Sequence, residues 1–482
     1  MIKFGTGGFR GVISDTFNKE NIQLVAQSLA NIIIDEKSTN PVIIGFDNRF
    51  MSDFAARWFG EVLAGNNIRV FIYEQSVPTP SVMSATRDLK NDYGVMITAS
   101  HNPYYFNGIK LFTKKGYDAD VNFTNKLEKY ANEVKEIKTI PFQEGKRRWL
   151  IQSYSNTNMY LSHIKTFIDP SIKNNKLKIL YNNMCGVGVV GLLPLAKEMR
   201  IHQFDVIHKE HDAFFNFNLP NPTYEALLED GFIDKVVDNH YDAGLATDSD
   251  GDRLGVIDEK GNYVSNNEIL ASLYYYLITK RGMKGDIVKN CATSILVDKV
   301  ANKLGYKCHE VDVGFKNITH GMDENNALLG GESSGGLTLR GYLYGKDSVF
   351  SSMLFMEMII KENKTVSEII KDVKDFAGYH HVFLEDQLPL RLESEKVIEI
   401  LKDNPPKFSR PLVDYKHFTR NFKYYFDNES WILIRLSGTE PAFRIFAELE
   451  DFSSGLIAIE EIKAYIENIQ LKIEGCKYEK NE

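Results

Sequence analysis

Residues 93–103 read YGVMITASHNP, an apolar run that passes directly into a polar loop. Two comparable apolar runs precede it, PVIIGFD at 41–47 and RVFIY at 69–73, and stretches with helical periodicity separate the three. Strand-like runs that alternate with helical stretches predict βαβ units and a mainly parallel sheet. We therefore expect Ser100 to follow the carboxyl end of a parallel strand, the edge at which α/β active sites assemble.

The same alternation returns twice further along the chain. Strands are predicted at 176–181, 202–208 and 243–247, then at 285–288 and 306–311 around a helix at 294–304. The C-terminal segment differs, because paired strands at 430–436 and 443–448 precede an amphipathic helix at 454–470. This pattern predicts three related α/β units followed by an α+β cap.

Length and composition define the class of protein. The chain has 482 residues, of which 43% are hydrophobic and 25% charged, and its net charge is −8. These values indicate a globular protein with room for three or four domains and exclude a disordered chain. Because the overall charge is negative, we expect no nucleic-acid partner, and any bound phosphate must be held by local groups of Arg, Lys and backbone N–H.

Cysteine usage and hydropathy bear on the cellular location. The four cysteines, Cys185, Cys291, Cys308 and Cys476, lack the C-x-x-C spacing of a zinc site or a disulfide framework. The start, MIKFGT, lacks the apolar segment of a signal peptide, and no apolar run approaches the roughly 20 residues that cross a bilayer. We therefore expect a cytoplasmic protein with reduced thiols and no membrane partner.

One glycine-rich turn suggests a different chemistry. GVGVVG at 186–191 matches the G-x-G-x-x-G pattern of dinucleotide-binding turns, and Glu210 ends the next predicted strand, where a ribose-binding acid could stand. A tight glycine turn between a strand and a helix is also ordinary packing, and no other motif supports hydride transfer. An NAD-dependent oxidoreductase that uses the Gly186 loop remains an alternative.

The acidic loop DSDGDR at 248–253 is a sharper signal. Asp248, Asp250 and Asp252 can converge on a hard cation, which prefers oxygen ligands. An EF-hand does not fit, because Arg253 occupies the position that requires glycine and the flanking segments read as strands. A solvated acidic turn is the simpler alternative, but three adjacent carboxylates repel one another without a cation. The loop is therefore predicted to bind a divalent metal.

Ser100 and His101 are adjacent in TASHNP, which suggests a Ser–His hydrolase. Neighbouring side chains in an extended loop point apart, however, and the chain has no G-x-S-x-G elbow. A polar turn before Pro103 is the structural alternative. Lys110, in NGIK at 107–110, supplies a cation that could approach the same loop.

Three further loops have the composition of phosphate or sugar sites. GTGGFRG at 5–11 offers backbone N–H groups and one guanidinium to an anion. GGESSGG at 330–336 places a carboxylate and hydroxyls between glycines, a mix suited to sugar hydroxyls. RLSGTE at 435–440, with Arg444 across the turn, can bind a phosphate through guanidinium and hydroxyl groups. Together these loops predict phosphoryl chemistry on a polyhydroxylated substrate.

In this order the motifs resemble those of the α-D-phosphohexomutases, the phosphoglucomutase and phosphomannomutase family. The matching set, which spans essentially the whole chain, is GTGGFRG at 5–11, TASHNP at 98–103, NGIK at 107–110, DSDGDR at 248–253, GFK at 314–316, GGESSGG at 330–336, KD at 346–347 and RLSGTEP at 435–441. The resemblance implies an α/β fold with four domains around a central cleft: three related α/β domains with mixed sheets and a C-terminal α+β domain. The implied domains are 1–150 with the phosphoserine loop, 151–257 with the metal loop, 258–372 with the sugar-binding loop and 373–482 with the phosphate-binding loop.

The resemblance also implies a role for each residue of the site. Ser100 would carry a phosphoryl group as phosphoserine, and Mg²⁺ would be held by Ser100, Asp248, Asp250 and Asp252. The other catalytic residues would be Arg10, which clamps the phosphoserine, His101, which orients its oxygens, Lys110, which transfers a proton or contacts phosphate, and Lys346, a general acid or base. The substrate-binding residues would be Arg253, Lys316, Glu332, Ser334, Arg435, Ser437, Gly438, Thr439 and Arg444.

The implied reaction interconverts hexose 1-phosphate and hexose 6-phosphate through a hexose 1,6-bisphosphate that turns end over end. Gly336, where mannose-type members often have His, and the GFK at 314–316 favour glucose phosphate, with mannose phosphate second. The G-H-I-x-x-K-D-G pattern of relatives reads GYLYGKDS at 341–348, which leaves the geometry of the sugar loop open. A phosphomutase for ribose or glucosamine phosphate and a catalytically silent sugar-phosphate-binding protein remain alternatives. We expect a monomer or a homodimer.

Overall fold

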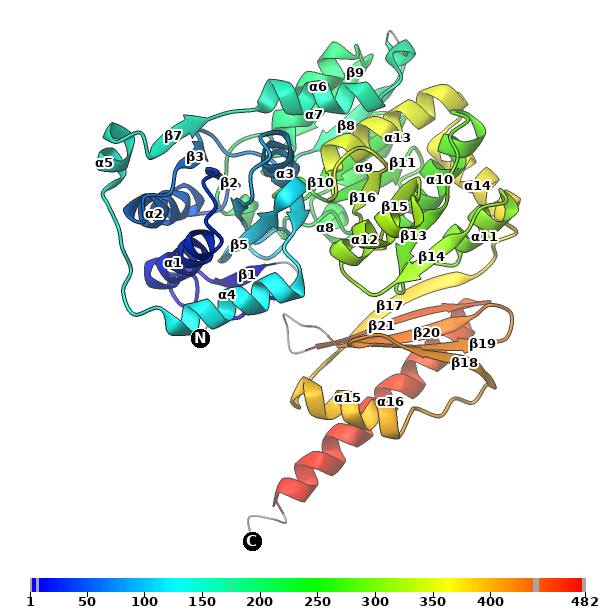
Figure 1. The fold of residues 1–482 in the computed structure, drawn as a ribbon. Helices are drawn as coiled ribbons and strands as arrows, with labels where there is room; N and C mark the ends of the chain where they lie inside the picture. Colours follow the sequence, from blue (N-terminus) through cyan, green and yellow to red (C-terminus); the bar gives the residue numbers. More distant parts are fainter. Residues whose placement is uncertain (1, 6–7, 174, 437–441, 479–482) are drawn as a thin grey trace.

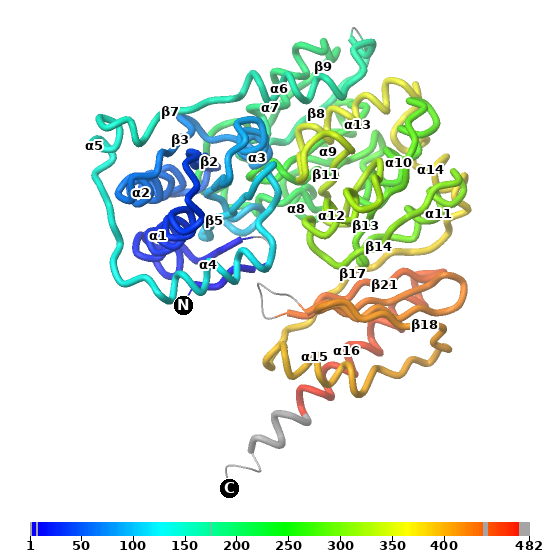
Figure 2. The backbone as a smooth tube through the Cα atoms, in the orientation of Figure 1, coloured from blue at the N-terminus to red at the C-terminus, as the bar shows by residue number. Residues whose placement is uncertain are grey.

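The computed structural model describes residues 2–5, 8–173, 175–436 and 442–478; Figure 1 shows its secondary structure and Figure 2 its backbone path. Four sheets, each with its own helices, follow one another along the chain. In Figure 1 the blue first unit lies beside the green second and third units, and the orange and red C-terminal unit lies below the third. The predicted class, three α/β units with a C-terminal α+β unit, is confirmed. None of the described helices is both long and apolar enough to span a bilayer.

The first unit contains a mixed sheet in the order β1-β5-β4-β2-β3-β7, with β6 paired to β5. Its strands are β1 (Phe9–Val12), β2 (Val42–Phe46), β3 (Val70–Tyr73), β4 (Gly94–Ile97), β5 (Phe106–Thr113), β6 (Tyr117–Asp118) and β7 (Ile151–Tyr154). Its helices are α1 (Lys19–Asp35), α2 (Ser52–Gly65), α3 (Thr79–Asp88), α4 (Val121–Glu133) and α5 (Phe142–Arg147), with a 3₁₀ turn at Lys114–Gly116. The pairs from β4 to β7 are parallel, whereas β5 pairs antiparallel with β1, β4 and β6. Every residue of β4 is buried, as expected for a strand covered on both faces.

The second unit contains a five-stranded sheet in the order β12-β11-β10-β8-β9. Its strands are β8 (Lys178–Asn182), β9 (Gln203–Ile207), β10 (Ala243–Thr247), β11 (Leu254–Asp258) and β12 (Tyr263–Val264). Its helices are α6 (Thr157–Phe167), α7 (Val189–Glu198), α8 (Tyr224–Glu229) and α9 (Phe232–Asp238), with 3₁₀ turns at Pro170–Ile172 and Phe215–Phe217. Strands β8, β9 and β10 are parallel, but β10 and β11 form an antiparallel pair. The acidic loop is the connection between β10 and β11.

The third unit contains a four-stranded sheet in the order β14-β13-β15-β16. Its strands are β13 (Ile287–Asn290), β14 (Cys308–Val311), β15 (Leu329–Gly331) and β16 (Leu337–Leu339). Its helices are α10 (Asn266–Thr279), α11 (Leu296–Lys303), α12 (Phe315–Asn325), α13 (Ser348–Glu362) and α14 (Val366–Ala377). Strand β13 is parallel to both neighbours, whereas β15 and β16 are antiparallel and are joined by the loop that contains Glu332. One continuous apolar core runs from Tyr160 to Ala377, so the second and third units share their packing.

The C-terminal unit is an antiparallel sheet in the order β17-β21-β20-β19-β18. Its strands are β17 (Val382–Pro389), β18 (Leu412–His417), β19 (Asn421–Phe426), β20 (Trp431–Leu436) and β21 (Ala442–Leu449), and its helices are α15 (Ser394–Asp403) and α16 (Phe452–Tyr478). The helices pack on one face of this sheet. From the other face, Trp431, Leu433 and Phe446 pack against Cys291 and Ala292 of the third unit. The sheet is therefore joined to the third unit by an apolar contact.

Candidate active site

Ser100 stands just beyond the carboxyl end of β4, as the alternating pattern predicts. Its backbone is left-handed, with φ of 51°, and its N–H donates to Thr98 Oγ1 at 2.8 Å. The hydroxyl donates to Asp248 Oδ2 at 3.2 Å and lies 3.3 Å from His101 Nδ1. The side chain of a serine that two loops enclose in this way is held in one orientation, pointing at the acidic loop.

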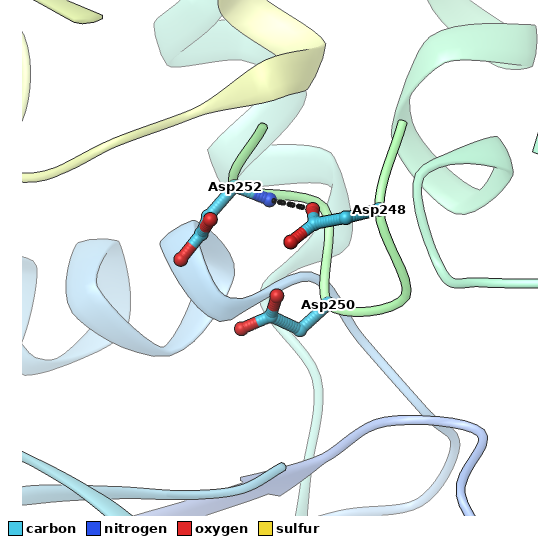
Figure 3. A group of neighbouring side chains, drawn as sticks. All are labelled: Asp248, Asp250 and Asp252. Carbon is cyan, nitrogen blue, oxygen red and sulfur yellow. Dashed lines mark hydrogen bonds between the residues drawn. The ribbon is translucent and has the colours of Figure 1, made fainter. Parts of the chain in front are cut away.

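The three aspartates of the acidic loop converge, as Figure 3 shows. One carboxylate oxygen from each of Asp248, Asp250 and Asp252 lies within 4.8 Å of the others, and all three residues are buried. Asp248 Oδ1 accepts the backbone N–H groups of Asp252 at 2.9 Å and Arg253 at 3.0 Å, which fixes the turn.

The donor set of this loop fits a divalent cation. Asp250 Oδ1 and Asp252 Oδ1 are buried and accept no hydrogen bond from any residue that the structure describes, so two oxygens inside the cluster lack the partner that burial normally requires. Carboxylate and hydroxyl oxygens are the ligands that Mg²⁺ prefers. Asp248, Asp250 and Asp252, with Ser100 or a phosphate on it, can therefore hold such an ion.

Lys110 of β5 ties the first unit to the acidic loop. Its Nζ donates to Asp250 Oδ2 at 2.6 Å and to Asp252 Oδ2 at 2.7 Å. Burial opposes the charge of Lys110, but the two carboxylates outweigh burial and raise its pKa. Burial and the neighbouring aspartates raise the pKa of Asp248. Lys110 therefore stays cationic and offsets part of the negative charge of the loop.

Further positive charge surrounds the serine. Arg10 of β1 donates through Nη1 to Asn102 Oδ1 in the loop at residues 98–103, which we call the serine loop. Burial, together with the charge of Arg253, lowers the pKa of Arg10 to about 10. Burial, followed by the charges of Arg253 and Arg10, lowers the pKa of His101 well below its usual value. His101 is thus neutral at pH 7, while Arg10 remains a cation.

Glu332 and Ser334 face the cleft from the third unit. Ser334 Oγ donates to Glu332 Oε1 at 2.7 Å, and Asn290 Nδ2 donates to Glu332 Oε2 at 3.1 Å. Lys346 Nζ lies 3.5 Å from Glu332 Oε1 and 3.6 Å from Asp252 Oδ1. A Cβ at Gly336 would lie 1.9 Å from Lys346 Cδ, so the glycine leaves the space through which Lys346 reaches the site.

Two arginines stand at the loop edge of the C-terminal sheet. Arg435 of β20 and Arg444 of β21 are paired residues across the two strands. Burial, followed by the charge of Arg444, lowers the pKa of Arg435. Their side chains bring two guanidinium groups to one place. Ser437, Gly438 and Thr439, which join these strands, lie outside the described residues, as do Thr6 and Gly7 of the N-terminal glycine loop.

All four units contribute to one cleft. The predicted site residues that line it are Arg10, Ser100, His101, Lys110, Asp252, Arg253, Lys316, Glu332, Ser334, Lys346, Arg435 and Arg444. Asp248 and Asp250 lie beneath this surface, fully buried. Residues that are up to 434 positions apart, Arg10 and Arg444, therefore meet at the shared centre, which confirms the predicted central cleft.

Arg49 supports the serine loop, although the sequence analysis did not single it out. Its guanidinium donates to the backbone carbonyls of Ser100, Asn102 at 2.6 Å, Pro103 at 2.9 Å and Phe106 at 3.0 Å. It is buried and paired with Asp47 at 3.3 Å. A signal for Arg49 was available in the sequence, because this residue lies two positions after the strand predicted at 41–47, whose carboxyl end meets the same edge of the sheet.

The Gly186 loop serves packing, and the oxidoreductase alternative is unsupported. A Cβ at Gly186 would lie 2.8 Å from Asp248 O, and Val187 N–H donates to Ser249 O at 3.1 Å. A Cβ at Gly188 would meet Thr247 Oγ1 and Tyr181 OH at 2.4 Å. The glycines let this turn press against the acidic loop, so the space that a dinucleotide pyrophosphate would need is filled by protein.

The departures at 341–348 lie partly outside the cleft. Tyr342 is buried, donates to Asp347 Oδ2 and stacks on Phe350 with ring centroids 4.1 Å apart. Ser348 begins α13 and its N–H donates to Gly251 O at 3.1 Å. Tyr342 therefore belongs to the core, and Ser348 braces the acidic loop through its backbone.

Comparison with known proteins agrees with this geometry. Family models described as phosphoglucomutase/phosphomannomutase alpha/beta/alpha domains I, II and III match residues 1–138, 158–261 and 265–376. The phosphoglucosamine mutase of Carboxydothermus hydrogenoformans is 27% identical over 471 residues, which cover 97% of this chain and 99% of the relative. The phosphoglucomutase/phosphomannomutase of Thermococcus kodakarensis is 27% identical over 452 residues, which cover 92% and 94%.

A solved structure extends the similarity through the C-terminal unit. A candidate phosphomannomutase from Thermus thermophilus superimposes with a TM-score of 0.83 at 25% identity and covers 97% of this chain and 99% of that one. Three consecutive domain models, full-length relatives and a full-length structural match agree with one another. The chain belongs to the phosphoglucomutase/phosphomannomutase family of intramolecular phosphotransferases.

Proposed function

We propose that this protein interconverts hexose 1-phosphate and hexose 6-phosphate, with glucose phosphate preferred over mannose phosphate, through a phosphoserine at Ser100. The observation that carries the proposal is the 3.2 Å contact between Ser100 Oγ and Asp248 at the base of a cleft lined by cationic side chains. A serine alone is a poor phosphoryl carrier. A serine beside three carboxylates that fit a divalent ion is suited to that role.

Mg²⁺ held by Ser100, Asp248, Asp250 and Asp252 would neutralise phosphate charge and stabilise the serine oxygen as it leaves. Arg10 and Arg253, which flank the serine loop, bind the phosphate oxygens on Ser100. His101 is neutral and lies beside Ser100 Oγ, so its ring can hydrogen-bond to one of these oxygens. Lys110 is held by two carboxylates and keeps the loop in place while it contacts phosphate.

Different units bind the two ends of the substrate. Arg435 and Arg444, with Ser437, Gly438 and Thr439, bind the phosphate that is not transferred. Glu332 and Ser334 bind sugar hydroxyls, and Lys316 lies on the same cleft surface. Lys346 is placed between Glu332 and Asp252, where it can exchange a proton with the attacking hydroxyl.

The reaction then follows from one serine and one distal phosphate site. The sugar hydroxyl attacks phosphorus, the bond between phosphorus and Ser100 Oγ breaks, and a hexose 1,6-bisphosphate forms. Because a single serine must reach both ends, the bisphosphate has to turn before its other phosphate returns to Ser100. The bisphosphate is thus both intermediate and activator.

Intact mass spectrometry with peptide mapping tests the mechanism. Purified protein is incubated with glucose 1,6-bisphosphate and Mg²⁺, and one added phosphoryl group on the peptide that contains Ser100 is expected. A phosphoryl group on another peptide, or none on the incubated protein, would overturn the proposal.

Substrate identity requires a panel of assays. Glucose, mannose, glucosamine and ribose phosphates are compared with Mg²⁺ present, and glucose phosphate is expected to give the highest kcat/KM. The relative in Carboxydothermus hydrogenoformans is a phosphoglucosamine mutase, so glucosamine phosphate is included as an alternative substrate. A higher kcat/KM for glucosamine phosphate would select that alternative.

A further inference from the structure

A carboxylate and an ammonium group line the cleft between the first and third units without touching each other. Asp118 lies on β6, and Lys316 is the second residue of α12. Neither side chain makes a hydrogen bond or an ion pair within 4.0 Å with any part of the chain that the structure describes, whereas the neighbouring Glu332, Lys110 and Lys346 all do. Both side chains are therefore available to bind a ligand.

The backbone on each side of this gap is held in place. Tyr117, which precedes Asp118, donates through its hydroxyl to Asp323 of α12 and stacks on Tyr344 with ring centroids 4.2 Å apart. This contact holds β6 against α12, so Asp118, the other residue of β6, is fixed at the cleft that Lys316 also lines. Lys316 lies two residues after Gly314, whose positive φ of 121° allows the chain to turn where α12 begins.

The two groups interact electrostatically across the gap. Burial lowers the pKa of Lys316, and the Asp118 carboxylate is the largest influence that opposes it. Burial raises the pKa of Asp118, while Lys110, Lys346 and Lys316 oppose that rise. The charges that act on Asp118 are those of these three lysines and Asp252, and the charges that act on Lys316 are those of Asp118, Asp120 and Asp312.

A sugar hydroxyl has the chemistry to join this pair. A hydroxyl carries one donor hydrogen and two acceptor lone pairs, so it can donate to a carboxylate and accept from an ammonium group at the same time. A protonated amino group only donates, and it would add a second cation beside Lys316. An apolar group would leave both charges unsatisfied, which is costly in a buried site.

We infer that Asp118 and Lys316 bind one hydroxyl of the hexose ring, which donates to Asp118 and accepts from Lys316, and that this pair is a specificity determinant of the cleft. The inference rests on the proposed mutase function and adds Asp118 to the sugar-binding residues Lys316, Glu332 and Ser334. It assigns to Asp118 a role in substrate selection that no motif in the sequence indicates.

A cycle of paired changes in enzyme and substrate tests this inference. Wild-type protein, Asp118→Ala and Lys316→Met are assayed with glucose 6-phosphate and with its 2-deoxy, 3-deoxy and 4-deoxy analogues. For one of the three positions, removal of the hydroxyl should lower wild-type kcat/KM by about 10- to 100-fold, as expected for a hydrogen bond to a charged group. In each variant the same removal should have a smaller effect than in the wild type, because one of the two partners of the hydroxyl is already missing.

The controls separate local from general damage. Glu133→Gln changes an exposed carboxylate at the end of α4, away from the residues that line the cleft, so its kinetic parameters should match wild type. Thermal unfolding checks that each variant folds, and Asp118→Asn, which keeps an acceptor oxygen, replaces Asp118→Ala if the latter does not fold. Equal losses for every deoxy analogue in wild type and variants would overturn the inference.

Binding measurements show whether this inference or the proposed function has failed. Isothermal titration with glucose 6-phosphate needs no turnover, and Asp118→Ala should weaken binding by about tenfold or more. A wild-type protein that binds glucose 6-phosphate without turnover would contradict the proposed function while the titration still tests Asp118. Unchanged affinity in Asp118→Ala would overturn the inference even if turnover is confirmed.

Discussion

The hydroxyl of Ser100 donates to the carboxylate of Asp248 across 3.2 Å, although 148 residues separate them in the chain. A second contact runs beside it, because Ser249 Oγ donates to the Ser100 carbonyl. The serine loop of the first unit and the acidic loop of the second therefore form one structure. This junction is the basis of the first three predictions.

Ser100→Ala should abolish mutase turnover and leave the fold intact. The hydroxyl is the only atom of Ser100 that the proposed chemistry uses, and its loss removes one hydrogen bond worth about 1 kcal/mol. Loss of a nucleophile usually lowers kcat by several orders of magnitude, here at least about 10³-fold. A coupled assay with added glucose 1,6-bisphosphate measures the rate. Ser155→Ala, at an exposed serine, is the matched control, and wild-type activity in Ser100→Ala would remove the serine from its proposed role.

Asp250→Asn should raise the Mg²⁺ concentration needed for half-maximal activity by at least about tenfold. Asp250 Oδ1 is a buried oxygen of the acidic loop that accepts no hydrogen bond from the described residues, so a neutral amide there weakens the cation site directly. The measurement is a Mg²⁺ titration of activity at saturating substrate. Asp234→Asn, on the exposed side of α9, should leave the titration unchanged. An unaltered Mg²⁺ requirement in Asp250→Asn would contradict the predicted ligand set.

Arg49→Lys should impair turnover more than substrate binding. Lysine keeps the charge beside Asp47, but it lacks the planar guanidinium group through which Arg49 donates to four backbone carbonyls in and just after the serine loop. We expect kcat to fall by about tenfold or more with KM changed less than about threefold, and the free energy of unfolding to fall by about 1–3 kcal/mol. Steady-state kinetics and urea denaturation measure both. A rise in KM at constant kcat would point to a role in substrate binding instead.

Glu310→Gln should loosen the C-terminal sheet in a pH-dependent way. Glu310 accepts from Lys423 and from Tyr425 at 2.8 Å across the contact between the third and C-terminal units. Burial would raise the pKa of Glu310, but Lys423 and Lys289 outweigh it and lower the pKa from 4.5 to about 2. Its contribution to stability is therefore complete above about pH 4.5 and is lost as the pH falls towards 2.

The size of this effect has an upper limit. A pKa shift from 4.5 to about 2 corresponds to about 3 kcal/mol at pH 7. The burial of Lys423, which lowers the pKa of that ammonium group, offsets part of this energy.

Trp431 is buried at this contact, with Lys423 Nζ 4.1 Å from its ring centroid. In a Trp58→Phe, Trp149→Phe background its fluorescence follows unfolding of the C-terminal unit. The difference in unfolding free energy between the protein with Glu310 and the Glu310→Gln variant should be at most about 3 kcal/mol at pH 7 and shrink by about half at pH 3. A difference independent of pH would be inconsistent with this account.

Local sequence was sufficient to predict the first strands and to select residues that the structure brings together in one cleft. Apolar runs flanked by turn residues predicted β2, β3 and β4 at 41–47, 69–73 and 93–98, and the structure places these strands within one or two residues of each limit. The serine, acidic and sugar loops are each contiguous, so their composition alone is enough to predict their chemistry. The resemblance of their order along the chain then indicated the family, which the comparisons confirm.

Contacts between segments that are far apart along the chain could not be predicted from local sequence. The Gly186 turn matches a dinucleotide motif letter by letter, and only its packing against Asp248 and Ser249 shows that its glycines are needed for close approach of two loops. Arg49 and Asp118 carry no motif. Arg49 acts through carbonyls that belong to another loop, and Asp118 gains significance from Lys316, which lies 198 residues later.

Hydrophobic periodicity and short contiguous motifs are local properties of the chain, so the amino-acid sequence alone predicts the strands and helices, the family and the chemistry of each loop. Which loops share a cleft, and which charged groups have no partner among the described residues, became visible only in the folded molecule. Those relationships depend on how four units pack, and packing joins residues whose separation along the chain carries no information about their distance in space.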